Sequence, residues 1–364
     1  MTKIDVIMGV RPDFIQAAAL NRTFSEYEDK LDLRFIHTGQ HYDLELSQIH
    51  LEQLNVNPLH AILPVEGEQG NQQLSAIMLA YEQQQLLDPP DFVLVMGNSN
   101  SALACSLITA RNGIGLGHIG AGTRYENRLL IEEQNDLLID QLATLLFPSD
   151  SESVINLIRE GAENSRIVEI GNIRADSVFQ NLGHVEDSNV LDRYGLESGA
   201  FITVTLHHAY LLKDIPFLIS FFTLLEELSE SLTIHAVLHP QTQMIIEDIP
   251  EIIQESSDNF QIVSAHNYHD MLKLIKNSAM VVTDSQGLQE ETTILGVQCL
   301  TLGEFTNRPI TLAKGTNTLV GRSSELLRAK IMEIVSGERK EAYPMELWDG
   351  KAGQRLAQYL LNNS

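Results

Sequence analysis

Residues 281–291 carry the residue types of a phosphate-binding turn. The sequence VVTDSQGLQEE predicts a short buried strand, a polar turn with one glycine and the first turn of a helix. Free backbone N–H groups and the helix dipole favour an anion at such a helix N-terminus. Ser285 adds a hydroxyl donor, Gly287 lets the backbone approach a ligand, and Glu291 is placed to accept from a ribose diol. The alternative is an ordinary strand-to-helix turn that Ser285 caps.

A second turn of this kind lies near the N-terminus. The apolar run 4–8 is followed by Gly9-Val10-Arg11-Pro12-Asp13, and proline suits the first position of a helix. The guanidinium of Arg11 has the forked geometry that binds phosphate oxygens. Two such turns, far apart in one chain, predict two α/β domains that close on one phosphorylated ligand.

The rest of the chain alternates between apolar runs and helical patterns, which predicts doubly wound parallel sheets. A length of 364 residues suits two domains. The expected strands are 4–8, 33–37, 92–96, 114–119, 145–148 and 167–170, then 201–206, 233–238, 260–263, 280–283 and 298–302. The expected helices are 12–20, 44–54, 71–85, 101–111 and 151–160, then 216–229, 270–277, 287–295, 323–335 and 346–362.

Composition excludes several classes of partner. The net charge of −25 reflects 49 acidic against 24 basic residues, and no basic run is present to neutralise nucleic-acid phosphates. No segment approaches the ~20 apolar residues of a membrane-spanning helix, and the first ten residues do not form a signal peptide. Cys105 and Cys299 lie in apolar surroundings and are expected to be buried free thiols. We therefore expect a cytoplasmic protein without membrane insertion.

Metal and cofactor sites are not expected. His235 and His239 are four residues apart, but the residues between them predict a strand, which separates the two imidazoles too far for one metal ion. No Gly-x-Ser-x-Gly elbow or Walker loop is present.

Seven motifs occur in order along the chain: Gly9-Val10-Arg11-Pro12, Thr38-Gly39-Gln40-His41, Gly117-His118-Ile119-Gly120-Ala121-Gly122-Thr123-Arg124, Ile131-Glu132-Glu133-Gln134-Asn135, Gly171-Asn172, the segment 284–291 and Thr306-Asn307-Arg308-Pro309. In these motifs the chain resembles the non-hydrolysing UDP-N-acetylglucosamine 2-epimerase family, and the match spans nearly the whole chain.

The resemblance implies a GT-B fold, in which two Rossmann-like domains hold a UDP-sugar in the cleft between them. The implied division is an N-terminal domain over 1–172, a nucleotide-binding domain over 173–345 and a C-terminal helix within 346–364 that returns to the first domain. The resemblance also implies a homodimer whose ligand is UDP or a UDP-sugar, with no cofactor.

The family's reaction eliminates UDP across the C1–C2 bond and adds it back from the other face, which inverts C2. This requires a base for the C2 proton and support for the leaving diphosphate. The residues that the resemblance places at the nucleotide are Arg11, Met271, Ser285, Gln286, Gly287, Glu291 and Arg308. The catalytic candidates are His207, Glu132, Glu133, Arg11 and Asn98, and the sugar pocket would include His41, Gly120 and Arg124.

The sugar end departs from the family pattern. Asn98 and Gly120 replace two acidic residues of the family, and Asp136 stands where the family has an arginine. An amide cannot take a proton at neutral pH. The phosphate turn also has Gln286 where the family has a glycine, and Gln16 replaces a basic residue after the first motif.

Three interpretations follow. The protein is an epimerase that uses Glu132, Glu133 or His207 as its base; or a sugar-nucleotide hydrolase or glycosyltransferase-like enzyme on the same scaffold; or a non-catalytic protein that binds a sugar nucleotide. All three interpretations share the residues that match the family's nucleotide-binding positions.

Overall fold

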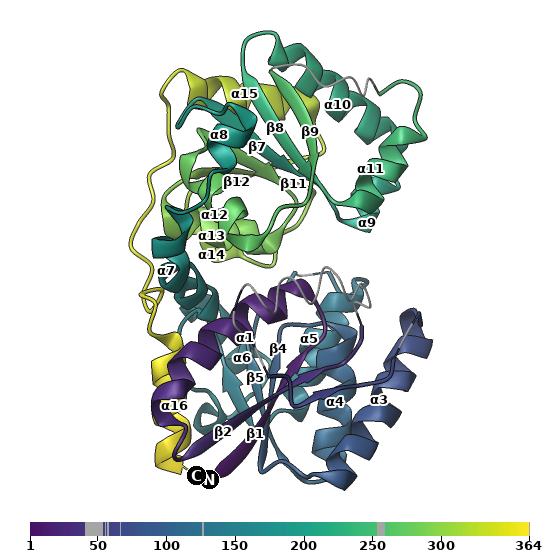
Figure 1. Ribbon diagram of the computed structural model, residues 1–364, viewed down its shortest axis with the longest axis vertical. Coiled ribbons are helices and arrows are strands. Elements are labelled where there is room, and N and C mark those ends of the chain that lie inside the picture. The colour runs from purple at the N-terminus through teal and green to yellow at the C-terminus, as the bar shows by residue number, and fades with distance from the viewer. Residues whose placement is uncertain are drawn as a thin grey trace. The chain divides into compact units, whose positions relative to one another are not determined.

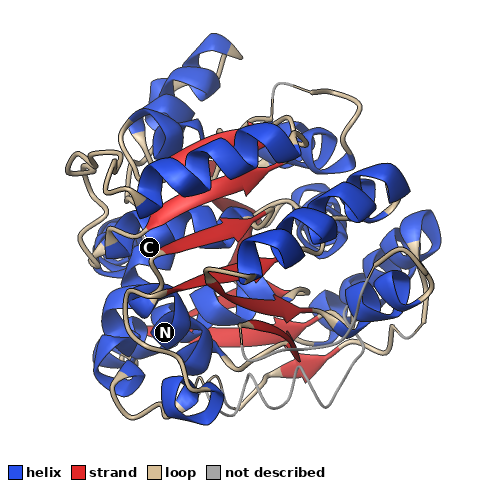
Figure 2. Cartoon of the chain, turned by 90° about the horizontal axis from the view of Figure 1, so that it is seen from above, coloured by secondary structure: helices blue, strands red, loops and turns tan. Residues whose placement is uncertain are grey.

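Each half of the chain builds its own six-stranded parallel sheet (Figure 1). The computed structural model describes residues 1–40, 54, 56, 58–65, 67–125, 127–252 and 259–363. These residues divide into unit 1, which comprises Met1–Gln180 and Glu346–Ser364, and unit 2, which comprises Asn181–Met345. Helices lie on both faces of the strands (Figure 2). The predicted doubly wound α/β class is therefore confirmed.

The sheet of unit 1 has the strand order β3-β2-β1-β4-β5-β6. Its central strand β1 pairs in parallel with β2 on one side and with β4 on the other. The strands are β1 (Thr2–Met8), β2 (Leu31–His37), β3 (Ala61–Ile62), β4 (Phe92–Met96), β5 (Gly115–Ile119) and β6 (Leu145–Phe147).

Residues 167–170 do not form the strand that we expected. Their only ladder contact is an isolated bridge between Leu146 and Ile167. The apolar run is explained by packing instead, because Ile170 is buried and Ile167 packs at the margin of the core.

Helices connect these strands and cover the sheet. They are α1 (Arg11–Phe24), α3 (Gly70–Leu87), α4 (Asn100–Arg111), α5 (Ile131–Leu142) and α6 (Ser151–Arg159), with short 3-10 helices at Ser25–Tyr27 and Asn164–Arg166. Helix α5 was not among the expected helices. The predicted helix 44–54 lies outside the described residues except for Leu54, which is buried.

The C-terminal segment belongs to unit 1. Its helix α16 (Ala352–Asn363) packs beside α1, where the yellow and purple helices adjoin in Figure 1. Residues 346–351, which we expected to be helical, precede the helix instead. Asp176 caps α16 by accepting from the backbone N–H groups of Ala352 at 3.0 Å and Gly353 at 2.7 Å. Trp348 donates its indole N–H to the carbonyl of Ser149.

Helix α7 (Ile173–Val185) passes from unit 1 into unit 2, whose sheet has the order β12-β11-β10-β7-β8-β9. The central strands are β7 and β10, and they pair with each other in parallel. The strands are β7 (Phe201–Thr205), β8 (Thr233–Leu238), β9 (Phe260–Ser264), β10 (Met280–Thr283), β11 (Gln298–Leu302) and β12 (Asn317–Gly321).

The helices of unit 2 bury one apolar cluster on each side of this sheet. The larger cluster is built on α10 and includes Phe217, Phe221 and Phe222. The helices are α8 (Val190–Tyr194), α9 (Ala209–Leu212), α10 (Ile215–Ser229), α11 (Pro240–Glu247), α12 (Tyr268–Asn277), α13 (Gln286–Leu295), α14 (Pro309–Ala313) and α15 (Ser324–Val335). Among the described residues, no helix is both long and apolar enough to cross a membrane.

Candidate functional site

The candidate residues of unit 2 lie at the carboxyl ends of β7 and β10. The chain leaves these neighbouring strands in opposite directions across the sheet, because β8 lies beyond β7 and β11 beyond β10. Open α/β sheets bind ligands at this kind of switch point, outside the carboxyl ends of the strands. His207 follows β7 and Asp284 follows β10, so both residues belong to this position.

Asp284 ties the two strand ends together. Its Oδ2 atom accepts hydrogen bonds from the backbone N–H groups of His207 at 2.9 Å and His208 at 2.7 Å. Its Oδ1 atom lies 2.9 Å from Nδ1 of His207, whose side chain is 48% exposed. Burial by itself raises the pKa of Asp284, but the two histidines and the backbone N–H of His208 hold it at about 2. An ionised carboxylate therefore orients a half-exposed imidazole at the strand end.

The turn that we predict to bind phosphate has the expected strand–turn–helix build. Helix α13 begins at Gln286, and its N-cap Ser285 makes no side-chain capping hydrogen bond. The backbone N–H of Ser285 is instead bonded to Oγ1 of Thr283 at 2.9 Å. The hydroxyl of Ser285 is therefore not used as a cap. Ser285 is thus the N-cap residue by position, and its role in binding a phosphate stays a prediction.

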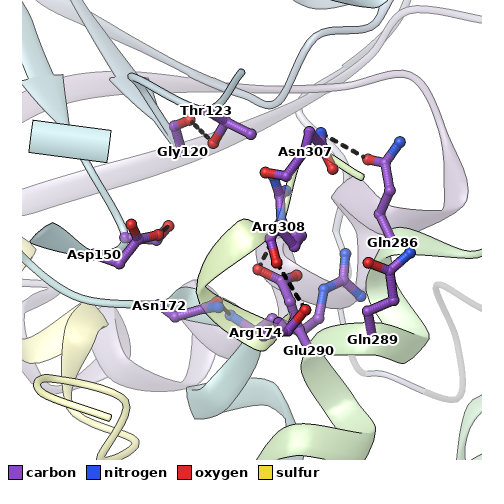
Figure 3. Close-up of polar contacts among 12 residues, drawn as sticks. Gly120, Thr123, Asp150, Asn172, Arg174, Gln286, Gln289, Glu290, Asn307 and Arg308 are labelled. Carbon is purple, nitrogen blue, oxygen red and sulfur yellow. Dashed lines mark hydrogen bonds and ion pairs between the residues drawn. The ribbon is translucent and has the colours of Figure 1, made fainter. Parts of the chain in front are cut away.

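Polar contacts join the first turns of α13 to the loop before α14 (Figure 3). Arg308 donates from Nε to Oε1 of Glu290 at 2.9 Å, and Asn307 donates to Oε1 of Gln286 at 3.1 Å. Glu291 is buried in the same helix. Arg308 and Gln286 are thus held within unit 2 by these contacts, and their contact with a nucleotide stays a prediction.

Met271 lies in the smaller apolar cluster of unit 2. It comes from α12 and is buried with Leu274, Val281 and Leu288. Met271 therefore packs with Leu288 of α13, and its contact with a nucleotide stays a prediction.

Unit 1 has its own switch point, between β1 and β4. Gly9 follows β1, and a Cβ atom built there would lie 1.9 Å from Oγ of Ser101 and 2.5 Å from its Cβ. Only glycine fits this close approach of the β1 turn to α4. Arg11 begins α1, and Asp13 accepts from the backbone N–H groups of Gly9 at 2.9 Å and Val10 at 3.1 Å. Burial raises the pKa of Asp13 to about 7 against these hydrogen bonds.

Asn98 lies in the turn after β4 and is held by α5. Its Nδ2 donates to Oδ2 of Asp136 at 2.7 Å, and its backbone carbonyl accepts from Nδ2 of Asn135 at 2.8 Å. Asp136 is only 1% exposed, whereas Asn98 is half-buried. Burial raises the pKa of Asp136 to about 7, and the hydrogen bond from Asn98 acts in the opposite direction.

One turn along α5 from Asp136, Asp140 belongs to a buried ionic cluster. Asp140 accepts from Arg124 at 2.6 Å and lies 2.7 Å from Nδ1 of His118. Arg124 also pairs with Glu160 at 2.5 Å. Burial by itself would raise the pKa of Asp140 and lower that of His118, but the pairing reverses both directions. The guanidinium of Arg124 thus forms ion pairs with two carboxylates inside unit 1, and its contact with a sugar stays a prediction.

The remaining sugar-end candidates have different environments. Glu133 is buried and accepts from the backbone N–H of Tyr125 at 2.6 Å, whereas Glu132 is exposed on the first turn of α5. Gly120 has a φ of +85°, and a Cβ atom built there would meet no atom within 4 Å. His41 lies outside the described residues. Glu132 therefore keeps an exposed carboxyl, while that of Glu133 is used to hold the loop.

The structure adds Asp13, Asp136 and Asp284 to the candidate residues. Each is a buried aspartate close to the end of a central strand, and each binds a strand-end group of the candidate site. The sequence signal for Asp284 was its place directly after an apolar strand. Among the described residues, no group of three or more His, Cys, Asp or Glu side chains could hold a metal ion.

Comparison with known proteins identifies the family of the chain. The family model described as UDP-N-acetylglucosamine 2-epimerase matches residues 25–361. The chain belongs to this family.

Similar epimerases cover the chain from end to end. A UDP-N-acetylglucosamine 2-epimerase of Methanocaldococcus jannaschii is 31% identical, with 98% of each chain covered. A UDP-2,3-diacetamido-2,3-dideoxy-D-glucuronate 2-epimerase of Pseudomonas aeruginosa is 30% identical, with 98% of this chain and 99% of that protein covered. The crystal structure of the M. jannaschii UDP-GlcNAc 2-epimerase in complex with UDP-GlcNAc and UDP is similar with a TM-score of 0.91 at 30% identity, covering 99% and 100% of the two chains. The predicted GT-B fold of the epimerase family is thereby confirmed.

Proposed function

We propose that the protein is a UDP-sugar 2-epimerase that interconverts UDP-GlcNAc and UDP-ManNAc. The observation that carries this proposal is the paired strand end of unit 2, where Asp284 orients His207 beside the N-terminus of α13. Full-length similarity to 2-epimerases, one of them solved with UDP-GlcNAc and UDP, supports the same substrate.

The nucleotide end provides donors for a diphosphate. The uncapped backbone N–H groups of α13, the hydroxyl of Ser285 and the guanidinium of Arg11 are the groups that we assign to it. Gly287 allows the backbone to approach the ligand, and Glu291 is our candidate for the ribose. These assignments follow the residues that the family resemblance marks.

The reaction requires two functions from the protein, stabilisation of the leaving UDP and removal of the proton from C2. The C1–O bond breaks and releases UDP while a base takes the proton from C2, which leaves a glycal; the reverse addition from the other face gives the C2 epimer. His207 is suited to the leaving diphosphate, because an imidazole paired with a carboxylate is stabilised as the cation. Glu132 is our candidate for the base, since its carboxyl is exposed on the first turn of α5.

The test is proton and phosphorus NMR of the purified protein with UDP-GlcNAc in D₂O. The proposal expects deuterium at C2 and the appearance of UDP-ManNAc. Release of free UDP and a sugar, without deuterium at C2 of the nucleotide sugar, would indicate hydrolysis and contradict the proposal. An unchanged substrate with broadened nucleotide signals would indicate a binding protein and contradict it as well.

A second UDP-sugar should be tested in the same NMR experiment. The P. aeruginosa relative acts on a UDP-2,3-diacetamido uronate and is as similar as the UDP-GlcNAc epimerases. Both sugars carry a 2-acetamido group and a C2 proton, so the same elimination applies to either. Competition between the two UDP-sugars for turnover would identify the preferred one.

We propose further that the protein is a cytoplasmic homodimer with an N-terminal domain over 1–172, a nucleotide-binding domain over 173–345 and a C-terminal segment 346–364 that returns to the first domain. The buried free thiols of Cys105 and Cys299 suit a reducing compartment. Light scattering coupled to size-exclusion chromatography tests the dimer, with a mass near that of one 40.6 kDa chain as the contradicting result.

A further inference from the structure

Asp136 occupies an unusual position for a carboxyl group. It lies on the second turn of α5, is 1% exposed, and directs Oδ2 at the side-chain amide of Asn98, 2.7 Å away. A buried carboxyl is costly unless the fold gives it partners. Its partner here belongs to the turn after β4, one of the two strands that flank the switch point of unit 1.

We propose that Asp136 is a positioning residue for the reaction, because it holds Nδ2 of Asn98 inward and makes Asn98 present Oδ1, a hydrogen-bond acceptor, at the end of β4. This inference rests on the proposed function, since the acceptor is meant for the reacting end of the sugar. Asp136 itself is too buried to reach a ligand and acts through Asn98.

Two contacts fix Asn98 in this orientation. The side-chain amide of Asn98 donates to Asp136, and its backbone carbonyl accepts from Asn135. Two successive residues of α5 therefore bind one residue of the turn after β4. The described residues provide no donor to Oδ1 of Asn98. The amide therefore has one satisfied end inside the unit and one acceptor at the strand end.

Protonation of Asp136 would reverse this arrangement. An ionised carboxylate only accepts hydrogen bonds, so it selects Nδ2 of Asn98; a protonated carboxyl donates, and so it stabilises the flipped amide, in which Oδ1 points inward and Nδ2 outward. Burial raises the pKa of Asp136 to about 7, which places this change within the working range of most enzymes.

The groups around Asp136 set the balance between the two forms. His118 from β5 and Arg124 from the following loop favour the carboxylate, while Asp140, one turn along α5, favours the protonated form. Helix α4 also packs on α5, and its one charged residue is Arg111 in its last turn. Asn98 contributes a hydrogen bond and no charge.

The experiment compares Asp136→Ala and Asp136→Asn with the wild type in the C2 deuterium-exchange assay over about pH 5.5–9. Asp136→Ala removes the partner of Asn98 and is expected to lower kcat about 10- to 100-fold while the Kd for UDP changes less than about twofold. Asp136→Asn keeps an acceptor oxygen and is expected to retain most of kcat but to lose the wild-type inflection near pH 7. Equal kcat and identical pH profiles in all three proteins would overturn the inference.

Two controls separate this inference from the proposed function. Asp29→Ala removes an exposed aspartate elsewhere in unit 1 and is expected to match the wild type. For a readout without turnover, the protein is labelled with ¹⁵N-asparagine, and the Nδ2 signal of Asn98 is identified by its loss in Asn98→Asp. This signal is expected to shift with a midpoint near pH 7 in the wild type and to stay constant in Asp136→Asn.

The outcomes are distinct. If the wild type has no epimerase activity but the Asn98 signal titrates as expected, the proposed function fails and the Asp136–Asn98 coupling stands. If the wild type is active and Asp136→Ala retains the wild-type kcat, the inference fails and the proposed function stands, whether or not the Asn98 signal titrates.

Discussion

The imidazole of His207 meets the carboxylate of Asp284 across the two central strands of the second sheet, with Nδ1 2.9 Å from Oδ1. The same carboxylate accepts the backbone N–H groups of His207 and His208. One buried side chain therefore controls both the path of the backbone after β7 and the orientation of the imidazole. Its removal should affect stability and turnover together.

Asp284→Ala is expected to destabilise the protein by about 1–3 kcal/mol at neutral pH, because two backbone N–H groups lose their acceptor. The folded state lowers the pKa of Asp284 from 3.8 to about 2, so its stabilisation is present above pH 4 and is lost as the pH falls toward 2. Urea unfolding at about pH 7 and pH 3 should show a smaller difference between variant and wild type at the lower pH. A constant difference would contradict the assigned ionisation.

The nucleotide end is tested by Arg11→Ala and Ser285→Ala. Each substitution removes one donor that we assign to the diphosphate, so each should weaken UDP binding by about 1–3 kcal/mol in isothermal titration calorimetry. Arg111→Ala is the matched control, because this arginine is exposed in the last turn of α4. Unchanged UDP affinity in both test variants would remove these residues from the nucleotide site.

The sequence predicted the buried strands well because parallel strands covered on both faces are short apolar runs between turns. The predicted bounds of β4, β8, β10 and β11 agree with the structure residue for residue. The edge strand β12 was missed, since its sequence NTLVG is half polar and lacks such a run. The run 167–170 was wrongly predicted as a strand, because its apolar residues pack against the core without joining the sheet as a strand.

Helix α5 was not among the expected helices, and the reason bears on the site. Its sequence IEEQNDLLIDQL places Asp136 and Asp140 on the buried face, where a helical pattern requires apolar residues. The two aspartates are explained only by their partners Asn98 and His118, which are 38 and 22 positions away in the sequence. In the sequence, Asn98 and Asp136 are two separate departures from the family pattern; only the fold shows that their side chains are in contact.

Two glycines provide a matched test of packing at the first switch point. Gly9→Ala would place Cβ 2.5 Å from Cβ of Ser101, which cannot move without α4, so we expect a loss of about 1–3 kcal/mol. Gly183 lies within α7, and a Cβ atom there meets nothing within 4 Å. Gly183→Ala should therefore stabilise the protein by about 0.5–1 kcal/mol through helix propensity. Thermal unfolding should give shifts of opposite sign.

The buried carboxyl of Asp136 predicts a dependence of stability on pH. The fold raises its pKa from 3.8 to about 7, so its favourable contribution is present at low pH and is lost as the pH rises through 7. Asp136→Asn abolishes this loss. The free energy of unfolding of the variant minus that of the wild type should therefore be larger at pH 8 than at pH 5, by about 1–4 kcal/mol. Asp13 has a similarly raised pKa in both proteins, so its effect cancels. An identical difference at both pH values in urea unfolding would show that Asp136 does not titrate in this range.

Moving the carboxyl group across the Asn98–Asp136 contact tests whether the pair acts as a unit. Asn98→Asp alone would set two carboxyl groups 2.7 Å apart, so one of them must bind a proton, and we expect lower stability above pH 7 and little turnover. The double variant Asn98→Asp/Asp136→Asn restores one amide and one carboxyl, now with the carboxyl at the end of β4. Its free energy of unfolding should return to within about 1 kcal/mol of the wild type. A double-mutant cycle with the two single variants then gives the coupling energy between the two positions. Its C2 exchange should recover with a different pH profile, because the ionisable group is now half-exposed. Additive losses in stability and exchange would show that the two side chains act independently.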